Sequence, residues 1–373
     1  MLIGLPRMHK ESGELRDFLP DFVSFLAHQG ASEIVLEEGY GSGIGCNATQ
    51  YLRASPRIKF GSYEDCLSQD LVVVLRCPDS DALDLLRPGA ILLSMLHYAT
   101  NPRRSVRLLE RGVVAVSIDS IVDDGGARMV ENMSAVGWNG VEAAFRELQH
   151  SHPAFDIPRR PPLVATILGS GAVAGAAAFA SARYGDMDLR ARMVAKGVRG
   201  VEVTLIDYDL TSDEDYLLTR LERTDVLVDA SRRPDPTKTI VRNAWVNELP
   251  KHAVILDLAA DPYDFSVSPP VVKGIEGVPQ GDLDRFVFHV NDPVYDELNR
   301  HLDAAHRRLA LSCYSWPGIH PRECMVRYGG QLEPVMEVIL SKPTGEWNPM
   351  SDNHLERAVT RAKATTWAHQ SNA

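Results

Sequence analysis

The segment that decides the fold reads LVATILGSGAVAG and spans residues 163–175. Its first six residues are apolar except for one threonine, which predicts a buried strand of a parallel sheet. Three glycines follow, Gly169, Gly171 and Gly175, and they lead into an alanine-rich helix. A strand, a glycine-rich turn and a helix in this order are typical of the first βα unit of a dinucleotide-binding domain.

Each glycine of this motif has a predicted role. Gly169 permits the tight turn from strand to helix, and Gly171 lets backbone N–H groups approach a pyrophosphate at the helix N-terminus. Gly175 is expected to let the helix lie close to the sheet. Simple packing of glycine and alanine in a buried helix is the alternative interpretation.

The cofactor is predicted from the strand that follows, residues 201–207, which ends at Asp207. A carboxylate at this position accepts hydrogen bonds from the adenosine ribose and repels a 2′-phosphate, so NAD is favoured over NADP. Gly175 and Asp207 are 32 positions apart, against about 20 in the usual fingerprint. Residues 185–200 are expected to fill the excess as helix or loop, and Asp209 is an alternative ribose contact.

Strand–helix alternation extends through the rest of the chain. Five strands are expected early, at 2–6, 33–38, 71–76, 90–95 and 113–119, with helices at 16–30, 80–89 and 101–112. A long helix at 131–150 and a proline-rich linker at 151–162 precede a second series of strands, at 163–168, 201–207, 225–230, 252–259 and 286–290. Helices are expected again at about 322–341 and 354–368. This alternation predicts doubly wound parallel sheets of the α/β class.

Composition narrows the class of protein. A length of 373 residues favours two domains, and a net charge of −11 argues against a nucleic-acid partner. The five cysteines form no CxxC pair, so neither a disulfide framework nor a metal site is predicted, and a cytoplasmic location is expected. The start of the chain lacks a signal-peptide pattern. Residues 163–182 carry no charge, but their alanine and glycine content argues against a membrane span.

Three polar residues fall near the ends of strands or turns in the first half of the chain. Arg76 ends the apolar run LVVVLR (71–76), His97 follows the strand at 90–95, and Arg16 opens an expected helix. In open α/β sheets the carboxyl ends of the strands are where ligands bind. The alternatives are a solvated cation for Arg16 and a hydrogen-bonded core residue for His97.

Several short motifs occur together in a recognisable order. They are RDFLP (16–20), DLVVVLRCP (70–78), MLH (95–97), MS (133–134), DLAAD (257–261) and SWPGIHPRECMVRYGGQLEPVMEVIL (315–340). The pattern resembles the alanine dehydrogenase / saccharopine dehydrogenase (L-lysine-forming) superfamily. The last motif, residues 315–340, is similar to the corresponding segment in the saccharopine or opine-type branch of this superfamily.

The resemblance implies two Rossmann-like doubly wound domains with an interdomain cleft. Residues 1–135 plus 311–373 would form the substrate domain, and residues 136–310 the dinucleotide-binding domain. The implied activity is that of an NAD-dependent oxidoreductase acting on the C–N bond of an opine-type secondary amine, formed from a 2-oxo acid and an amine. An alanine-dehydrogenase-like deaminase of a primary amino acid is the alternative. The expected partners are these small molecules, with neither nucleic acid nor membrane, and a homo-oligomer is possible.

The resemblance also implies roles for individual residues. His97 would be the general acid/base and Arg16 would bind a substrate carboxylate. Asp261 would lie beside the nicotinamide, and Met133 and Ser134 would face the cofactor.

Arg76 departs from the family pattern, because relatives carry a lysine there that shares the acid/base work. Arginine stays protonated in proteins, so Arg76 can anchor a carboxylate or carbonyl but cannot act as a base. Lys10 could supply the missing ammonium group. A non-catalytic dinucleotide-binding relative that lost this lysine is the third hypothesis.

Overall fold

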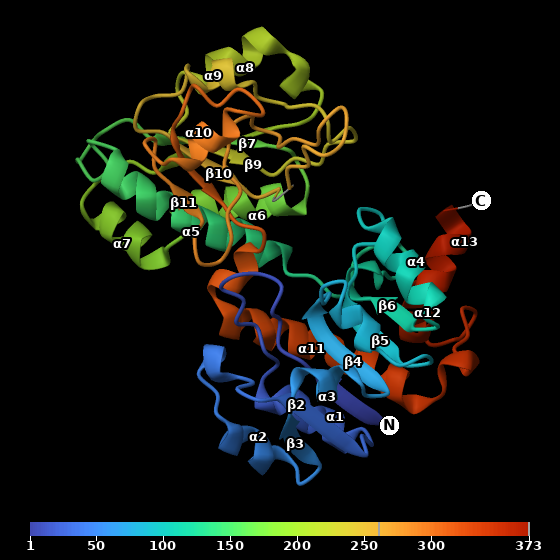
Figure 1. Ribbon diagram of the computed structural model, residues 1–373. Helices are drawn as coiled ribbons and strands as arrows, with labels where there is room; N and C mark the ends of the chain where they lie inside the picture. Colours follow the sequence, from blue (N-terminus) through green and yellow to red (C-terminus); the bar gives the residue numbers. More distant parts are fainter. Residues whose placement is uncertain (260–261, 372–373) are drawn as a thin grey trace. The chain divides into compact units, whose positions relative to one another are not determined.

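The computed structural model describes residues 1–259 and 262–371, which form two compact units. The first unit contains Met1–Asn132 and the chain from His320 onward, and the second unit contains Met133–Ile319 (Figure 1). Each unit is built on one six-stranded sheet. The predicted α/β class with two doubly wound sheets is confirmed. The roles predicted for the two domains, and the cleft predicted between them, stay predictions.

All strands of the first sheet run parallel. Their spatial order is β3 (Ile58–Gly61), β2 (Glu33–Glu37), β1 (Leu2–Leu5), β4 (Leu71–Arg76), β5 (Ile91–Met95) and β6 (Val114–Ser117). The order 3-2-1-4-5-6 places the reversal of winding between β1 and β4. Strand β3 was not predicted, because it is a short edge strand of four residues in which Lys59 separates the apolar Ile58 and Phe60. It therefore contains no extended apolar run.

Helices cover both faces of this sheet, which explains its uninterrupted apolar strands. Along β4, Leu71, Val73 and Leu75 belong to one core, while Val72 and Val74 belong to the other. The helices are α1 (Pro20–His28), α2 (Ala48–Ala54), α3 (Tyr63–Leu67), α4 (Pro102–Glu110), α11 (Pro321–Ser341), α12 (His354–Arg361) and α13 (Ala364–Ser371). Residues of α11 pack in the same core as β1 and α1, so the C-terminal helices complete the first unit.

Three predicted helices of this unit differ from the structure. The helix expected at 16–30 begins at Pro20, because proline is favoured at the first helical position, and Arg16 therefore precedes it. The helix expected at 80–89 is only a 3₁₀ turn, Ala82–Leu85, since Pro88 and Gly89 follow closely. The helix expected at 354–368 is divided into α12 and α13.

The second sheet is parallel except for β11. Its order is β11 (Val287–Phe288), β12 (Leu309–Ser312), β10 (Val254–Asp257), β9 (Val226–Asp229), β7 (Leu163–Leu168) and β8 (Val201–Ile206). Strand β12 was not predicted, because its short apolar run directly follows two arginines. The winding reverses between β7 and β9.

Six helices accompany this sheet: α5 (Met133–Ser151), α6 (Ala172–Ser181), α7 (Met187–Ala195), α8 (Glu214–Leu221), α9 (Asn243–Val246) and α10 (Val294–Leu298). The remaining 3₁₀ segments of the chain are Ser42–Ile44, Ile118–Ser120, Leu210–Ser212, Trp316–Ile319 and Thr344–Glu346. The uncharged stretch 163–182 is divided between β7 and α6. Among the residues that the structure describes, we find no helix with the length and apolarity needed to cross a membrane.

Candidate functional site

The glycine loop lies where the winding of the second sheet reverses, at the carboxyl end of β7. Gly169 has φ +108°, and a Cβ added to it would lie 2.7 Å from the carbonyl oxygen of Ala230 at the end of β9. Only glycine satisfies both constraints. Its N–H donates to the carbonyl of Ile206, at 2.8 Å. The turn therefore follows β7 at the position where open α/β sheets bind ligands.

The other two glycines of the motif leave space for a ligand. Gly171 is the N-cap of α6, and a Cβ added to Gly171 or Gly175 would meet no atom within 4 Å. The expectation that Gly175 brings the helix against the sheet is therefore wrong. The close approach occurs instead at Gly137 of α5, where an added Cβ would lie 2.7 Å from the Cβ of Ala176 in α6.

Asp207 lies beside this loop because β8 pairs with β7 in register, Ile206 opposite Leu168. Its side chain is exposed and accepts only the N–H of the next residue, at 2.8 Å. Asp209 accepts the N–H of Leu210 at a short 3₁₀ turn. An open glycine loop with an exposed aspartate on the adjacent strand fits a dinucleotide.

The remaining residues predicted for the cofactor lie elsewhere in the chain. Met133 and Ser134 open α5, one turn before the contact of Gly137 with α6, and Ser134 is exposed. Asp261 lies outside the described residues.

A buried acidic pair ends the neighbouring strands β9 and β10. Burial and the charge of Asp257 raise the pKa of Asp229 to about 6. Asp257 accepts hydrogen bonds from Lys273 Nζ, at 2.5 Å, and from the hydroxyl of Ser312, at 2.9 Å. The strands expected at 225–230 and 252–259 contain these aspartates, but no sequence pattern indicated Lys273. This network holds the strand ends beside the glycine loop.

In the first unit, Arg16 is buried and pairs with Glu14. Its Nε lies 2.7 Å from Glu14 Oε1, and its Nη2 lies 2.5 Å from Oε2, so the contact is bidentate. Burial alone would raise the pKa of Glu14, but the hydrogen bonds and charge of Arg16, with a contribution from Arg76, lower it. The pairing of Arg16 with Glu14 was not predicted.

Arg76 lies at the carboxyl end of β4, beside the reversal of winding in the first sheet. Its Nη2 is 3.2 Å from Glu11 Oε1, and its side chain is about one quarter exposed. Burial raises the pKa of the neighbouring Cys77 thiol to about 11, against the positive charges of Arg104, Lys10 and Arg76. These three cations are therefore close enough to act on the Cys77 thiol.

His97 follows β5 and is held by Asp119, which follows β6. Its Nδ1 lies 3.3 Å from Asp119 Oδ2, and its backbone N–H donates to Oδ1 at 3.2 Å. His97 has φ +49°, an uncommon backbone conformation that this contact supports. Burial would raise the pKa of Asp119, but the hydrogen bond and charge of His97 hold it well below its usual range. Asp119 thus stays a carboxylate and fixes the imidazole, which is half exposed.

A cavity of about 830 Å³ is lined by the segments that follow β4 and β5, residues 78–83 and 100–107, and its lining does not include Arg76 or His97. Its lining includes four cationic side chains, Lys10, Arg103, Arg104 and Arg107, and two acidic ones, Asp79 and Asp81. Arg107 pairs with Asp84 at 2.6 Å, and Arg104 donates to the carbonyl of Leu96. The sequence contained the run NPRR (101–104) in an expected helix, without any sign that it lines a cavity.

His97 with Asp119 and Arg76 thus follow the carboxyl ends of strands in one sheet, and the glycine loop follows the carboxyl end of β7 in the other. Such an arrangement is typical of α/β proteins that bind a nucleotide cofactor. Residues 10–137 match the family described as alanine dehydrogenase/PNT, N-terminal domain. The resemblance to the alanine dehydrogenase superfamily that the motifs predicted is confirmed over these residues.

Individual relatives agree with this assignment. Alanine dehydrogenase 1 of Staphylococcus aureus (strain Mu50 / ATCC 700699) is 23% identical over 278 residues, which cover 70% of this chain and 73% of that protein. Alanine dehydrogenase of Geobacillus stearothermophilus is 24% identical over 270 residues, with 70% and 72% covered.

Solved structures share the fold. An L-alanine dehydrogenase superposes with a TM-score of 0.71 at 18% identity and covers 97% of this chain and 94% of its own. A transhydrogenase from Sinorhizobium meliloti has a TM-score of 0.63 at 15% identity, with 92% and 96% covered. Assignment to the saccharopine or opine-type branch stays a prediction.

Proposed function

We propose that this protein is an NAD-dependent dehydrogenase acting on the C–N bond of an amino acid or an opine-type secondary amine. The observation that carries the proposal is the His97–Asp119 pair at the ligand-binding edge of the first sheet. A histidine fixed by a carboxylate on one nitrogen is suited to proton transfer with its other nitrogen. The relatives named above are alanine dehydrogenases, which supports the same general chemistry.

The chemistry assigns His97 a definite task. When a 2-oxo acid and a neutral amine condense, the nitrogen forms a bond to the carbonyl carbon as the π bond of the carbonyl breaks, and a proton moves from the nitrogen to that oxygen. The resulting hydroxyl takes a second proton and departs as water while the C=N bond forms. With Nδ1 directed at Asp119, Nε2 of His97 is the atom that would take and return these protons. A bound nicotinamide dinucleotide would exchange the hydride with the substrate carbon. Its pyrophosphate would be held at Gly169 and Gly171 and its adenosine ribose at Asp207.

Arg76 and Arg16 are proposed to hold carboxylates. Arg76 cannot deprotonate, and a substrate carboxylate would compete with Glu11 for its guanidinium. Arg16 is more constrained, because Glu14 already accepts from its Nε and Nη2. A substrate carboxylate could bind Arg16 only through the guanidinium N–H groups that do not already donate to Glu14.

The size and charge of the cavity support a larger anionic substrate than alanine. Arg103 is exposed and has no side-chain partner among the described residues, and Lys10 approaches Glu11 only to 3.9 Å. Such cations suit a second carboxylate, as in a dicarboxylic oxo acid or an opine. The alanine dehydrogenase names of the relatives favour the alternative, a primary amino acid. The two functions differ in the amine partner and are separated by one assay.

The assay follows oxidation of NADH with pyruvate, glyoxylate or 2-oxoglutarate, each combined with ammonia, lysine or ornithine. Turnover that requires a bulky amine supports the opine-type reaction, and turnover with ammonia supports the primary amino acid. NADH binding without turnover in any combination would contradict both and favour the non-catalytic hypothesis.

Arg103→Gln tests the cavity directly. We expect KM for 2-oxoglutarate to rise about 10-fold, as for the loss of one charge-assisted contact, with KM for glyoxylate unchanged. Arg53→Gln, an exposed arginine of α2 in the same unit, is the control and should alter neither value. An equal change in KM for both oxo acids in Arg103→Gln would show that the cavity does not take part in substrate recognition.

A further inference from the structure

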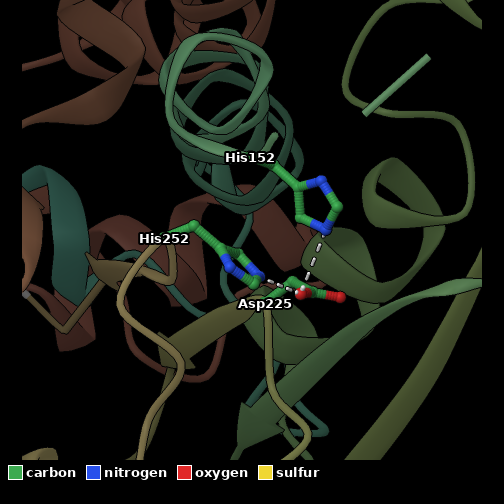
Figure 2. Close-up of side chains that lie close together, drawn as sticks. All are labelled: His152, Asp225 and His252. Atoms are coloured by element: carbon green, nitrogen blue, oxygen red, sulfur yellow. Dashed lines mark hydrogen bonds and ion pairs between the residues drawn. The ribbon is translucent and has the colours of Figure 1, made fainter. Parts of the chain in front are cut away.

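Two histidines and one aspartate converge in the second unit, at the edge opposite the glycine loop. His152 follows the end of α5, Asp225 precedes β9 and His252 precedes β10. Figure 2 shows both imidazole rings directed at the same carboxylate. Asp225 Oδ1 lies 2.7 Å from His252 Nε2 and 3.7 Å from His152 Nε2. One potential ligand atom from each side chain lies within 4.8 Å of the others.

We propose that His152, Asp225 and His252 form a binding site for a divalent transition metal ion of the zinc type. Imidazole nitrogen and carboxylate oxygen are ligands that Zn²⁺ accepts in tetrahedral geometry, with bonds of about 2.0–2.2 Å. These bonds place neighbouring ligand atoms roughly 3.3 Å apart. The observed 2.7 and 3.7 Å lie on either side of this value, and the two imidazole nitrogens lie within 4.8 Å of each other, so side-chain rotation would bring all three ligand atoms to one ion.

The carboxylate is already held in the orientation that a metal requires. Asp225 Oδ2 accepts the backbone N–H of Val164 at 2.7 Å, which leaves Oδ1 facing the two imidazoles. A hydrogen bond to the distant oxygen of a ligating carboxylate is the usual means of fixing its direction. The side chains of His152, Asp225 and His252 are 13%, 12% and 25% exposed, so water can reach the cluster and supply a fourth ligand.

The proton balance is also compatible with metal binding. His252 Nδ1 has no partner among the described residues, so its proton can move there when Nε2 binds the ion. His152 Nδ1 accepts the N–H of Ala154 at 3.1 Å, so binding through Nε2 exchanges this single hydrogen bond for a metal bond.

The role of the ion would be structural. His152, Asp225 and His252 lie at the amino ends of the strands, whereas Gly169 and Asp207 follow their carboxyl ends. The ion would connect the end of α5 to the starts of β9 and β10, three segments that are distant in the sequence. A ligand that binds only the folded chain raises its stability by mass action.

The test uses the untagged full-length chain after treatment with EDTA, titrated with ZnCl₂ by calorimetry and followed by thermal unfolding. We expect one ion per chain, a dissociation constant in the micromolar range or tighter, and a higher Tm with zinc. His252→Gln and His152→Gln should each weaken binding at least about 100-fold, since loss of residues that merely orient a ligand costs about 10- to 100-fold. The control is His150→Gln, an exposed histidine in the last turn of α5, which should bind like the parent chain.

A Co²⁺ titration identifies the coordination, because a tetrahedral site with nitrogen and oxygen ligands produces visible absorption bands. Near-UV circular dichroism establishes whether each variant is folded. If a histidine variant does not fold, Asp225→Asn is used in its place. Unchanged zinc affinity in a folded ligand variant, binding without one-to-one stoichiometry, or an unchanged Tm with zinc would each overturn the proposal.

Discussion

The two sheets of this protein both reverse their winding beside the first strand of their unit, but they differ in strand order and in what their strand ends carry. The edge at the end of β4, β5 and β6 in the first unit carries Arg76 and His97 with Asp119. The edge at the end of β7 and β8 in the second unit carries an open glycine loop and the exposed Asp207. Both edges lie where open α/β sheets bind ligands. The residues at each edge therefore carry the proposed difference, proton transfer at the first and dinucleotide binding at the second.

The sharpest test of this division is His97→Asn. We expect kcat to fall by about 10²- to 10⁴-fold, the usual contribution of a general acid/base, while the affinity for NADH changes less than about twofold. Turnover is measured by NADH absorbance and binding by fluorescence. His28→Asn, an exposed histidine of α1, is the control. A normal kcat would contradict the role of His97 in proton transfer. A parallel loss of NADH binding would contradict the assignment of the two roles to separate edges.

The second test compares two glycines of one motif. Gly169→Ala places a methyl group 2.7 Å from the Ala230 oxygen at φ +108°, so we expect a loss of at least about 2 kcal/mol in unfolding free energy and weaker NADH binding. Gly175→Ala occupies open space in α6 and should stabilise by about 0.5–1 kcal/mol. Urea unfolding and NADH titration measure both. Equal effects of the two substitutions would contradict the separate roles.

The third test concerns the choice between NAD and NADP. Asp207→Ser removes the charge that would repel a 2′-phosphate, and we expect the ratio of kcat/KM for NADPH to that for NADH to rise about 10-fold. Asp209→Ser is the matched control on the same turn. If Asp209→Ser changes the ratio and Asp207→Ser does not, the ribose contact belongs to Asp209.

The smallest expected effect is on the pH dependence of stability. Burial raises the pKa of Asp17 in the first unit from 3.8 to about 6, against the N–H of Gly41 and the charge of Arg7. The folded chain therefore binds more protons than the unfolded chain between these values, so this group lowers stability as the pH rises from about 4 to about 6.

Asp17→Asn should reduce the fall in unfolding free energy between pH 4.5 and pH 7 by about 1–3 kcal/mol. Asp21→Asn, an exposed position in α1, should leave the difference as it is in the parent chain. A steeper slope in Asp17→Asn would show that the carboxyl is charged throughout this range.

The sequence by itself determined the α/β class and most strands, because fully buried parallel strands must be apolar and helices between them must be amphipathic. It also indicated Gly169, Asp207, Arg76 and His97, since strand ends in this architecture collect ligand-binding residues. It did not reveal β3 or β12, whose short segments lack an extended apolar run.

Only the tertiary structure decided which groups meet. Glu14 with Arg16, Asp119 with His97 and Lys273 with Asp257 are pairs in which one partner has no distinguishing local pattern. The three residues of the proposed metal site are separated by 73 and 27 positions and have no metal-binding spacing. Periodicity reports which face of an element is buried, whereas pairing depends on strand order and on where loops cross, which are set by the packing of the whole chain.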